Sequence, residues 1–160
     1  MRKPPRQPRW DESDATRVRV LLECPPSDSP SIIASAIERR GYAVRTCEGP
    51  SLGPCALLED GACALVDGAD VVVNMLGTTP REARVLPAVA GLRRCPAVVA
   101  EVKYKVPAAA NGAAPSAVPE SADAITELPA PVTTSALFGG IEEALRRREQ
   151  RIAWWGDGFC

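Results

Sequence analysis

Residues 69–77, ADVVVNMLG, decide the fold that this sequence predicts. Three consecutive valines followed by Asn74 and Met75 are typical of a short β-strand that is buried on both faces. Strands of this kind occupy the middle of parallel sheets, where helices cover both sides. In open α/β sheets, ligands bind at the carboxyl ends of the strands. A functional site is therefore expected around Asn74 and Met75.

The composition excludes several classes of function. The chain has 160 residues, which suits one domain, and a formal net charge of −1 that favours neither nucleic-acid nor membrane partners. It contains no histidine, so Ser-His-Asp catalysis and histidine metal ligands are excluded. The basic N-terminus is not followed by an apolar segment, as a secretory signal would be, and no run near 18 apolar residues occurs. We therefore expect a cytoplasmic protein with reduced cysteines.

Working outward from the central strand, strands and helices alternate along the chain. The other expected strands are 17–24, 42–47, 95–102 and 123–128, and the expected helices are 30–40, 54–66, 81–94 with a kink at Pro87, and 136–151 capped by Ser135. Residues 103–121 are rich in Ala and Pro and predict a mobile loop in place of a regular fourth helix. Right-handed crossovers then give a flavodoxin-like three-layer α/β fold with a five-stranded parallel sheet of order 2-1-3-4-5.

Three regions follow from this reading. Residues 1–16 are expected to be a disordered, basic and proline-rich tail, residues 17–151 the α/β domain, and residues 152–160 an aromatic C-terminal tail.

The order and spacing of these elements resemble response-regulator receiver domains. The segments that carry the resemblance are VRVLLEC with IIASAIERRGYAVRTCEGP, then ADVVVNML, CPAVVAEV and LPAPVTTSALFGGIEEALRR, which together span residues 17–150. The resemblance implies a receiver-like fold. In this family the phosphorylation site needs an acid pair after the first strand, an Asp ending the third, a Ser or Thr ending the fourth, and a Lys before the proline that follows the fifth.

The chain departs from that pattern at each position. The matching residues are Cys24 and Pro25 for the acid pair, with Glu23 and Asp28 as the nearby acids, Asn74 or Met75 for the phosphoacceptor, Ala100 or Glu101 for the hydroxyl, and Ala130 for the lysine. Phosphoryl transfer depends on a nucleophile and on cations that stabilise spread negative charge. The resemblance therefore implies a degenerate receiver that is not an enzyme and needs no cofactor.

Such degenerate receivers act through protein contacts. The resemblance places the contact face on the fourth and fifth strands and the final helix, with Glu142, Arg146 and Arg147, followed by Trp154 and Trp155. An exposed Trp pair would anchor a protein partner or a second copy of the chain. Alternatively, the Trp side chains fold back on the domain's own surface.

Two further interpretations remain open. Cys47, Cys55 and Cys63 recur with seven residues between neighbours, so they form either a zinc, iron–sulfur or redox-sensing site or a set of small buried apolar residues. The stretch ADVVVNMLG also resembles a strand of Rossmann-type nucleotide-binding oxidoreductases. That fold requires a glycine-rich turn after the first strand, and the turn CPPSDSP has no glycine.

Overall fold

The computed structural model describes residues 9–92, 94, 96–103 and 124–155. Five parallel strands form one sheet of order β2-β1-β3-β4-β5, which confirms the flavodoxin-like prediction and differs from the Rossmann order. The strands are β1 (Arg19–Glu23), β2 (Ala43–Cys47), β3 (Val71–Asn74), β4 (Ala97–Val102) and β5 (Ile125–Pro129). The central strand β3 pairs with β1 on one side and β4 on the other, so Asn74 stands beside both Glu23 and Ala100.

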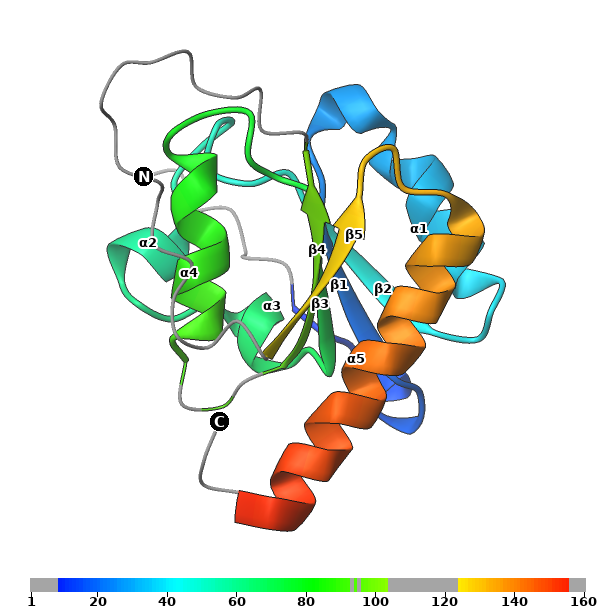
Figure 1. Ribbon diagram of the computed structural model, residues 1–160. Coiled ribbons are helices and arrows are strands. Elements are labelled where there is room, and N and C mark those ends of the chain that lie inside the picture. The colour runs from blue at the N-terminus through cyan, green and yellow to red at the C-terminus, as the bar shows by residue number, and fades with distance from the viewer. Residues whose placement is uncertain (1–8, 93, 95, 104–123, 156–160) are drawn as a thin grey trace, which may run out of the picture.

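Helices cover both faces of this sheet (Figure 1). The α-helices are α1 (Pro30–Glu38), α2 (Ala56–Glu59), α3 (Ala64–Asp67), α4 (Val85–Ala90) and α5 (Thr134–Trp155), and the 3₁₀ helices are η1 (Glu12–Thr16), η2 (Pro26–Asp28) and η3 (Glu82–Arg84). Helices α1 and α5 pack on one face, and α2, α3 and α4 on the other. Within the described ranges, no helix combines the length and the hydrophobicity needed to cross a membrane.

Alternating side chains of the inner strands fill two separate cores. On β3, Val71 and Val73 point toward α1 and α5, whereas Val72 points toward α2, α3 and α4. All three valines are at most 1% exposed. Full burial of each such side chain contributes roughly 1.5–3 kcal/mol. The unbroken valine run is therefore explained by a strand that is buried on both faces.

Three helix predictions need correction. The expected helix 54–66 is two four-residue helices, because Gly61 lies between them with a φ of +73°. The expected helix 81–94 is η3 followed by α4, and Pro87 lies in the first turn of α4, where a missing N–H disrupts no helical hydrogen bond. In α5 the side chain of Thr133, not Ser135, accepts the backbone N–H of Ala136 at 3.2 Å.

The predicted C-terminal tail is also shorter than expected. Helix α5 continues through Trp155, since no glycine or proline interrupts residues 141–155. Residues 156–160 lie outside the described residues, as do residues 104–121 of the predicted loop.

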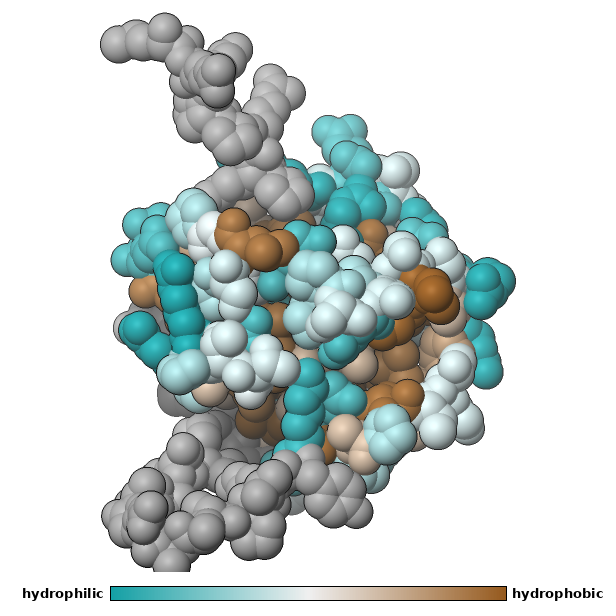
Figure 2. Space-filling model, turned by 90° about the horizontal axis from the view of Figure 1, so that it is seen from above, coloured by the Kyte–Doolittle hydropathy of each residue, from teal (hydrophilic) through white to brown (hydrophobic). Residues whose placement is uncertain are grey.

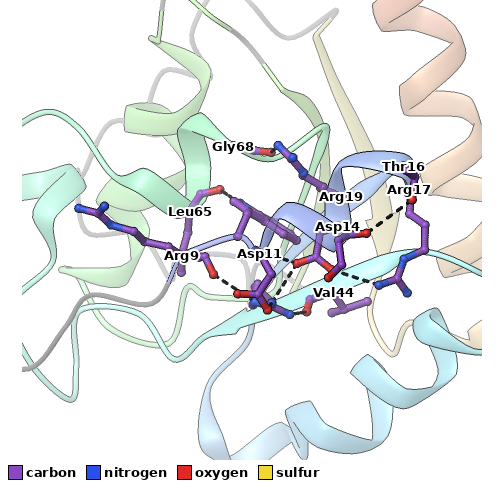
Figure 3. Close-up of polar contacts among 12 residues, drawn as sticks. Arg9, Asp11, Asp14, Thr16, Arg17, Arg19, Val44, Leu65 and Gly68 are labelled. Carbon is purple, nitrogen blue, oxygen red and sulfur yellow. Dashed lines mark hydrogen bonds and ion pairs between the residues drawn. The ribbon is translucent and has the colours of Figure 1, made fainter.

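Residues 10–17, here called the N-terminal strap, pack against the domain, so the prediction of a disordered tail is wrong for residues 9–16. The Trp10 indole N–H donates to the carbonyl of Leu65 at 2.8 Å. Asp14 is buried and forms ion pairs with Arg17 at 3.1 Å and Arg45 at 2.9 Å. Figure 3 shows Asp14 with Arg17, and Arg19 reaching the carbonyl of Gly68. Residues 1–8 lie outside the described residues.

Candidate functional site at the carboxyl edge of the sheet

The centre of the site is a buried pair formed by Glu23 and Asn74. These residues end β1 and β3 and are register partners in the parallel ladder. The Asn74 side-chain amide donates a hydrogen bond to a Glu23 carboxylate oxygen at 2.6 Å. Both residues are almost fully buried, at 2% and 3% exposure. The Asn74 amide at the end of β3 therefore already has a hydrogen-bond partner in the Glu23 carboxyl group.

The environment of Glu23 disfavours its charged form. Burial raises the pKa of Glu23 to about 7, and the hydrogen bond from Asn74 offsets only part of that effect. The carboxyl group therefore changes protonation near neutral pH.

A lysine lies beside two further carboxylates at this edge. The Lys103 ammonium is 3.5 Å from an oxygen of Asp28, in η2, and 3.9 Å from an oxygen of Glu101, in β4. The Glu101 side chain is 8% exposed, and its Oε2 has no hydrogen-bond partner among the described residues. Burial raises the pKa of Glu101, and the positive charge of Lys103 opposes that rise. Lys103 therefore supplies the positive charge beside Asp28 and Glu101.

The structure brings most of the predicted positions to this edge. Cys24 follows β1 and is buried, and its thiol donates to the carbonyl of Pro25 at 3.5 Å. Burial raises the pKa of the Cys24 thiol to about 11, and the negative charge of Asp28 adds to that rise. The Ala130 N–H donates to the carbonyl of Val102 at 3.1 Å, which places Ala130 beside the end of β4. Met75 instead packs into the core under α1 and α5, so Asn74 is the residue at the end of β3 that faces the site.

A second carboxylate fixes the loop that follows β3. Glu82 is buried and accepts hydrogen bonds from the Thr78 N–H at 2.8 Å, the Thr79 N–H at 3.1 Å and the Ser51 hydroxyl at 2.7 Å. Burial by itself would raise the pKa of Glu82, but the hydrogen bonds from Thr78, Ser51 and the backbone outweigh it and lower the pKa to about 2. The loop beside the site is therefore held in one shape.

The site residues that sequence reasoning missed are Glu23 as a partner of Asn74, the lysine Lys103 and the loop carboxylate Glu82. Their signal in the sequence is weak, because each contact depends on strand register or on loop geometry. Lys103 and Asp28, for example, are 75 residues apart in the chain.

The predicted cysteine group lies next to α2 and α3, and its Cys47 is the register partner of Glu23 in the ladder between β1 and β2. Cys47, Cys55 and Cys63 line one cavity of about 130 Å³. Among the described residues, no group of three or more His, Cys, Asp or Glu side chains is arranged as a metal site.

The predicted contact residues on α5 are at the surface. Arg146 and Arg147 both pair with Glu143, at 2.7 Å each, whereas Glu142 is exposed. Trp154 is 85% exposed, so the alternative that it folds back on the domain is wrong for this residue. The side chain of Trp155 lies outside the described residues.

Figure 2, which looks down on the carboxyl edge of the sheet, shows hydrophilic and intermediate residues with separate hydrophobic patches.

The fold matches solved receiver domains. A response regulator receiver domain protein from Bacillus halodurans is 18% identical, with a TM-score of 0.54 over 80% of this chain and 97% of that one. A receiver protein from Sinorhizobium medicae is 20% identical, with a TM-score of 0.55 over 82% and 97%. The N-terminal domain of a response regulator/sensory box/GGDEF three-domain protein from Carboxydothermus hydrogenoformans is 17% identical, with a TM-score of 0.54 over 84% and 98%.

This likeness establishes the receiver fold for the chain, as the element order in the sequence predicts. No protein-family model matches the sequence, and no curated protein is significantly similar to it.

Proposed function

We propose that this chain is a receiver-fold regulatory domain of the cytoplasm that acts through protein contacts and does not accept a phosphoryl group. The observation that carries the proposal is the Glu23–Asn74 pair. An amide stands at the end of β3, where the receiver pattern has a phosphoacceptor carboxylate, and it is already hydrogen-bonded at 2.6 Å. An amide is not a nucleophile for phosphoryl transfer, and its buried position supports a structural role.

The surroundings support the same conclusion. Transfer of a phosphoryl group requires cations that neutralise its developing charge. Here Lys103 lies close to both Asp28 and Glu101. Its charge is shared between these two acids, and Cys24 and Pro25 stand where the acid pair of the receiver pattern would be. We therefore infer that the edge is held together by its own ion pairs and hydrogen bonds.

The contact function is assigned to the outer face of α5 and to Trp154. The exposed indole is of the type that dominates binding energy in protein interfaces. The partner is another protein or a second copy of this chain.

Incubation with acetyl phosphate and Mg²⁺, followed by intact-mass measurement, tests the loss of phosphoryl transfer. The wild-type mass should stay unchanged. Asn74→Asp, which restores a carboxylate at the end of β3, is the matched variant and should incorporate more phosphoryl groups than wild type if the amide blocks transfer. Stoichiometric phosphorylation of the wild-type protein would overturn the proposal.

A further inference from the structure

Three thiols from separate parts of the chain meet at one cavity. Cys47 ends β2, Cys55 directly precedes α2, and Cys63 directly precedes α3. The cavity measures about 130 Å³, and among the described residues its other lining positions carry no polar side-chain atom: Gly49, Pro54, Ala56, Ala64 and Leu65. The thiol sulfurs are therefore the side-chain groups in this lining that can bind a ligand by coordination.

An internal repeat places two of these thiols at equivalent positions. Residues 55–62 read CALLEDGA and residues 63–69 read CALVDGA. Each cysteine has an extended backbone, and its carbonyl accepts an N–H of the four-residue helix that follows, from Glu59 at 3.0 Å and from Asp67 at 2.8 Å. The repeated local structure therefore presents Cys55 and Cys63 in the same way to one cavity, which a requirement for small buried residues would not demand.

The three thiols are partly accessible to solvent. All three are reduced and half-buried. An ion that binds here must displace the proton of each thiol that coordinates it. The lining residues that the structure describes include no carboxylate and no imidazole, whereas soft sulfur ligands select ions such as Cu(I).

We propose that this cavity is a binding site for a soft monovalent d¹⁰ metal ion, with Cu(I) as the probe, held by Cys55 and Cys63. Binding converts two neutral thiols into two metal–thiolate bonds and releases two protons to solvent, with no change in oxidation state. A tetrahedral zinc or iron–sulfur site needs four ligands. Two-coordinate binding needs only the two repeated cysteines, which agrees with the absence of a preformed site with three or more ligands among the described residues.

Metal binding at this cavity would affect the packing of the N-terminal strap. Leu65 lines the cavity, and its carbonyl accepts the hydrogen bond from the Trp10 indole. An ion that draws the segments before α2 and α3 together would therefore act on the element against which the strap packs.

The test is an anaerobic competition titration of the full reduced chain with Cu(I) and a coloured Cu(I) chelator, alongside Zn²⁺. The wild type should bind one ion with an apparent affinity that increases with pH. The double variant Cys55→Ser/Cys63→Ser should bind more than about tenfold more weakly. The matched control, Cys95→Ser/Cys160→Ser, also removes two cysteines but keeps Cys47, Cys55 and Cys63, and it should bind like wild type.

Alkylation of the wild-type protein provides a second measurement that does not depend on the folding of any variant. Bound Cu(I) should protect Cys55 and Cys63 from iodoacetamide, compared with the ion-free protein. Equal alkylation with and without Cu(I), equal affinity of the Cys55→Ser/Cys63→Ser variant, or displacement of Cu(I) by equimolar Zn²⁺ would each overturn the proposal.

Discussion

At the scale of single residues, Glu23 makes folding stability depend on pH. Its pKa rises from an ordinary 4.5 to about 7 in the folded protein, so the folded state holds the proton more tightly than the unfolded state. Its contribution to stability is fully present below about pH 4.5 and is lost as the pH rises to about 7. At about 1.4 kcal/mol per pH unit, the total loss is about 3 kcal/mol.

Glu23→Gln keeps an oxygen acceptor for the Asn74 amide and removes this titration. We expect the variant to be more stable than wild type at pH 8, by up to about 3 kcal/mol, and closer to wild type at pH 5. Urea denaturation at both pH values measures the difference, with the exposed Glu142→Gln as control. Parallel pH dependence of Glu23→Gln and wild type would show that Glu23 does not titrate near neutrality.

Residue-level prediction from sequence succeeded where a side chain follows directly from a strand end. Asn74 was expected at the carboxyl edge because a valine run ends there, and the structure places it there. The Glu23–Asn74 bond was not predicted, because it depends on which residues of β1 and β3 are register partners. The ion pair of Lys103 with Asp28 was not predicted either, because it joins the end of β4 to the turn after β1.

At the scale of elements, the N-terminal strap depends on the fit between Trp10 and α3. A Cβ atom at Gly68 would lie 2.3 Å from the Trp10 ring, so glycine is required for this packing. The guanidinium groups of Arg19 and Arg45 lie 6.0 and 5.7 Å from the same ring. One indole thus links the strap to α3, β1 and β2.

Trp10→Ala should lower the free energy of unfolding by about 3 kcal/mol, because it removes a large packed side chain and a hydrogen bond. Gly68→Ala should also destabilise the wild type by displacing Trp10, but it should cost much less in the Trp10→Ala background. Thermal and urea denaturation of both single variants and the double variant measure this coupling. Gly53→Ala, where an added Cβ has no atom within 4 Å, is the control. Additive effects would mean that Gly68 and Trp10 do not interact.

Element boundaries were predicted best for strands. The apolar runs around Val20, Val72 and Val98 predicted β1, β3 and β4, because a strand buried in the sheet consists mostly of apolar residues. The strap was missed because its stability comes from one indole and one buried carboxylate, Asp14, within a polar segment that follows a proline-rich one. The length of α5 was underestimated because its last turns carry polar residues and an exposed Trp154.

At the scale of the whole molecule, the order of elements was sufficient to predict the sheet. Five apolar strand patterns, all but the last two separated by helical patterns, allow few right-handed parallel arrangements, and the receiver fold is one of them. The match to receiver domains at 17–20% identity shows that this fold is specified by pattern rather than by particular residues. Function does not follow from the same pattern, since it depends on a few side chains at the carboxyl edge and on the surface.

The proposed contact surface gives a prediction for the assembled molecule. Helix α5 continues past the end of the sheet (Figure 1), and Trp154 on its last turns is 85% exposed. Because the indole packs so little against the domain, Trp154→Ala should change folding stability by less than about 0.5 kcal/mol. If the indole anchors a partner or a second copy, the variant should weaken that association by about 2 kcal/mol, roughly 30-fold in Kd.

Affinity capture from a native extract and light scattering over a range of concentrations measure the two kinds of association. Ile32→Ala is the matched control, because Ile32 is a helical hydrophobic residue of α1 that is 69% exposed. A partner or oligomer that is lost in Trp154→Ala and kept in Ile32→Ala would assign the contact to the end of α5. If both variants associate as strongly as wild type, the contact surface lies away from the end of α5. That result would also count against the proposal that the outer face around Glu142 and Arg146 binds a partner.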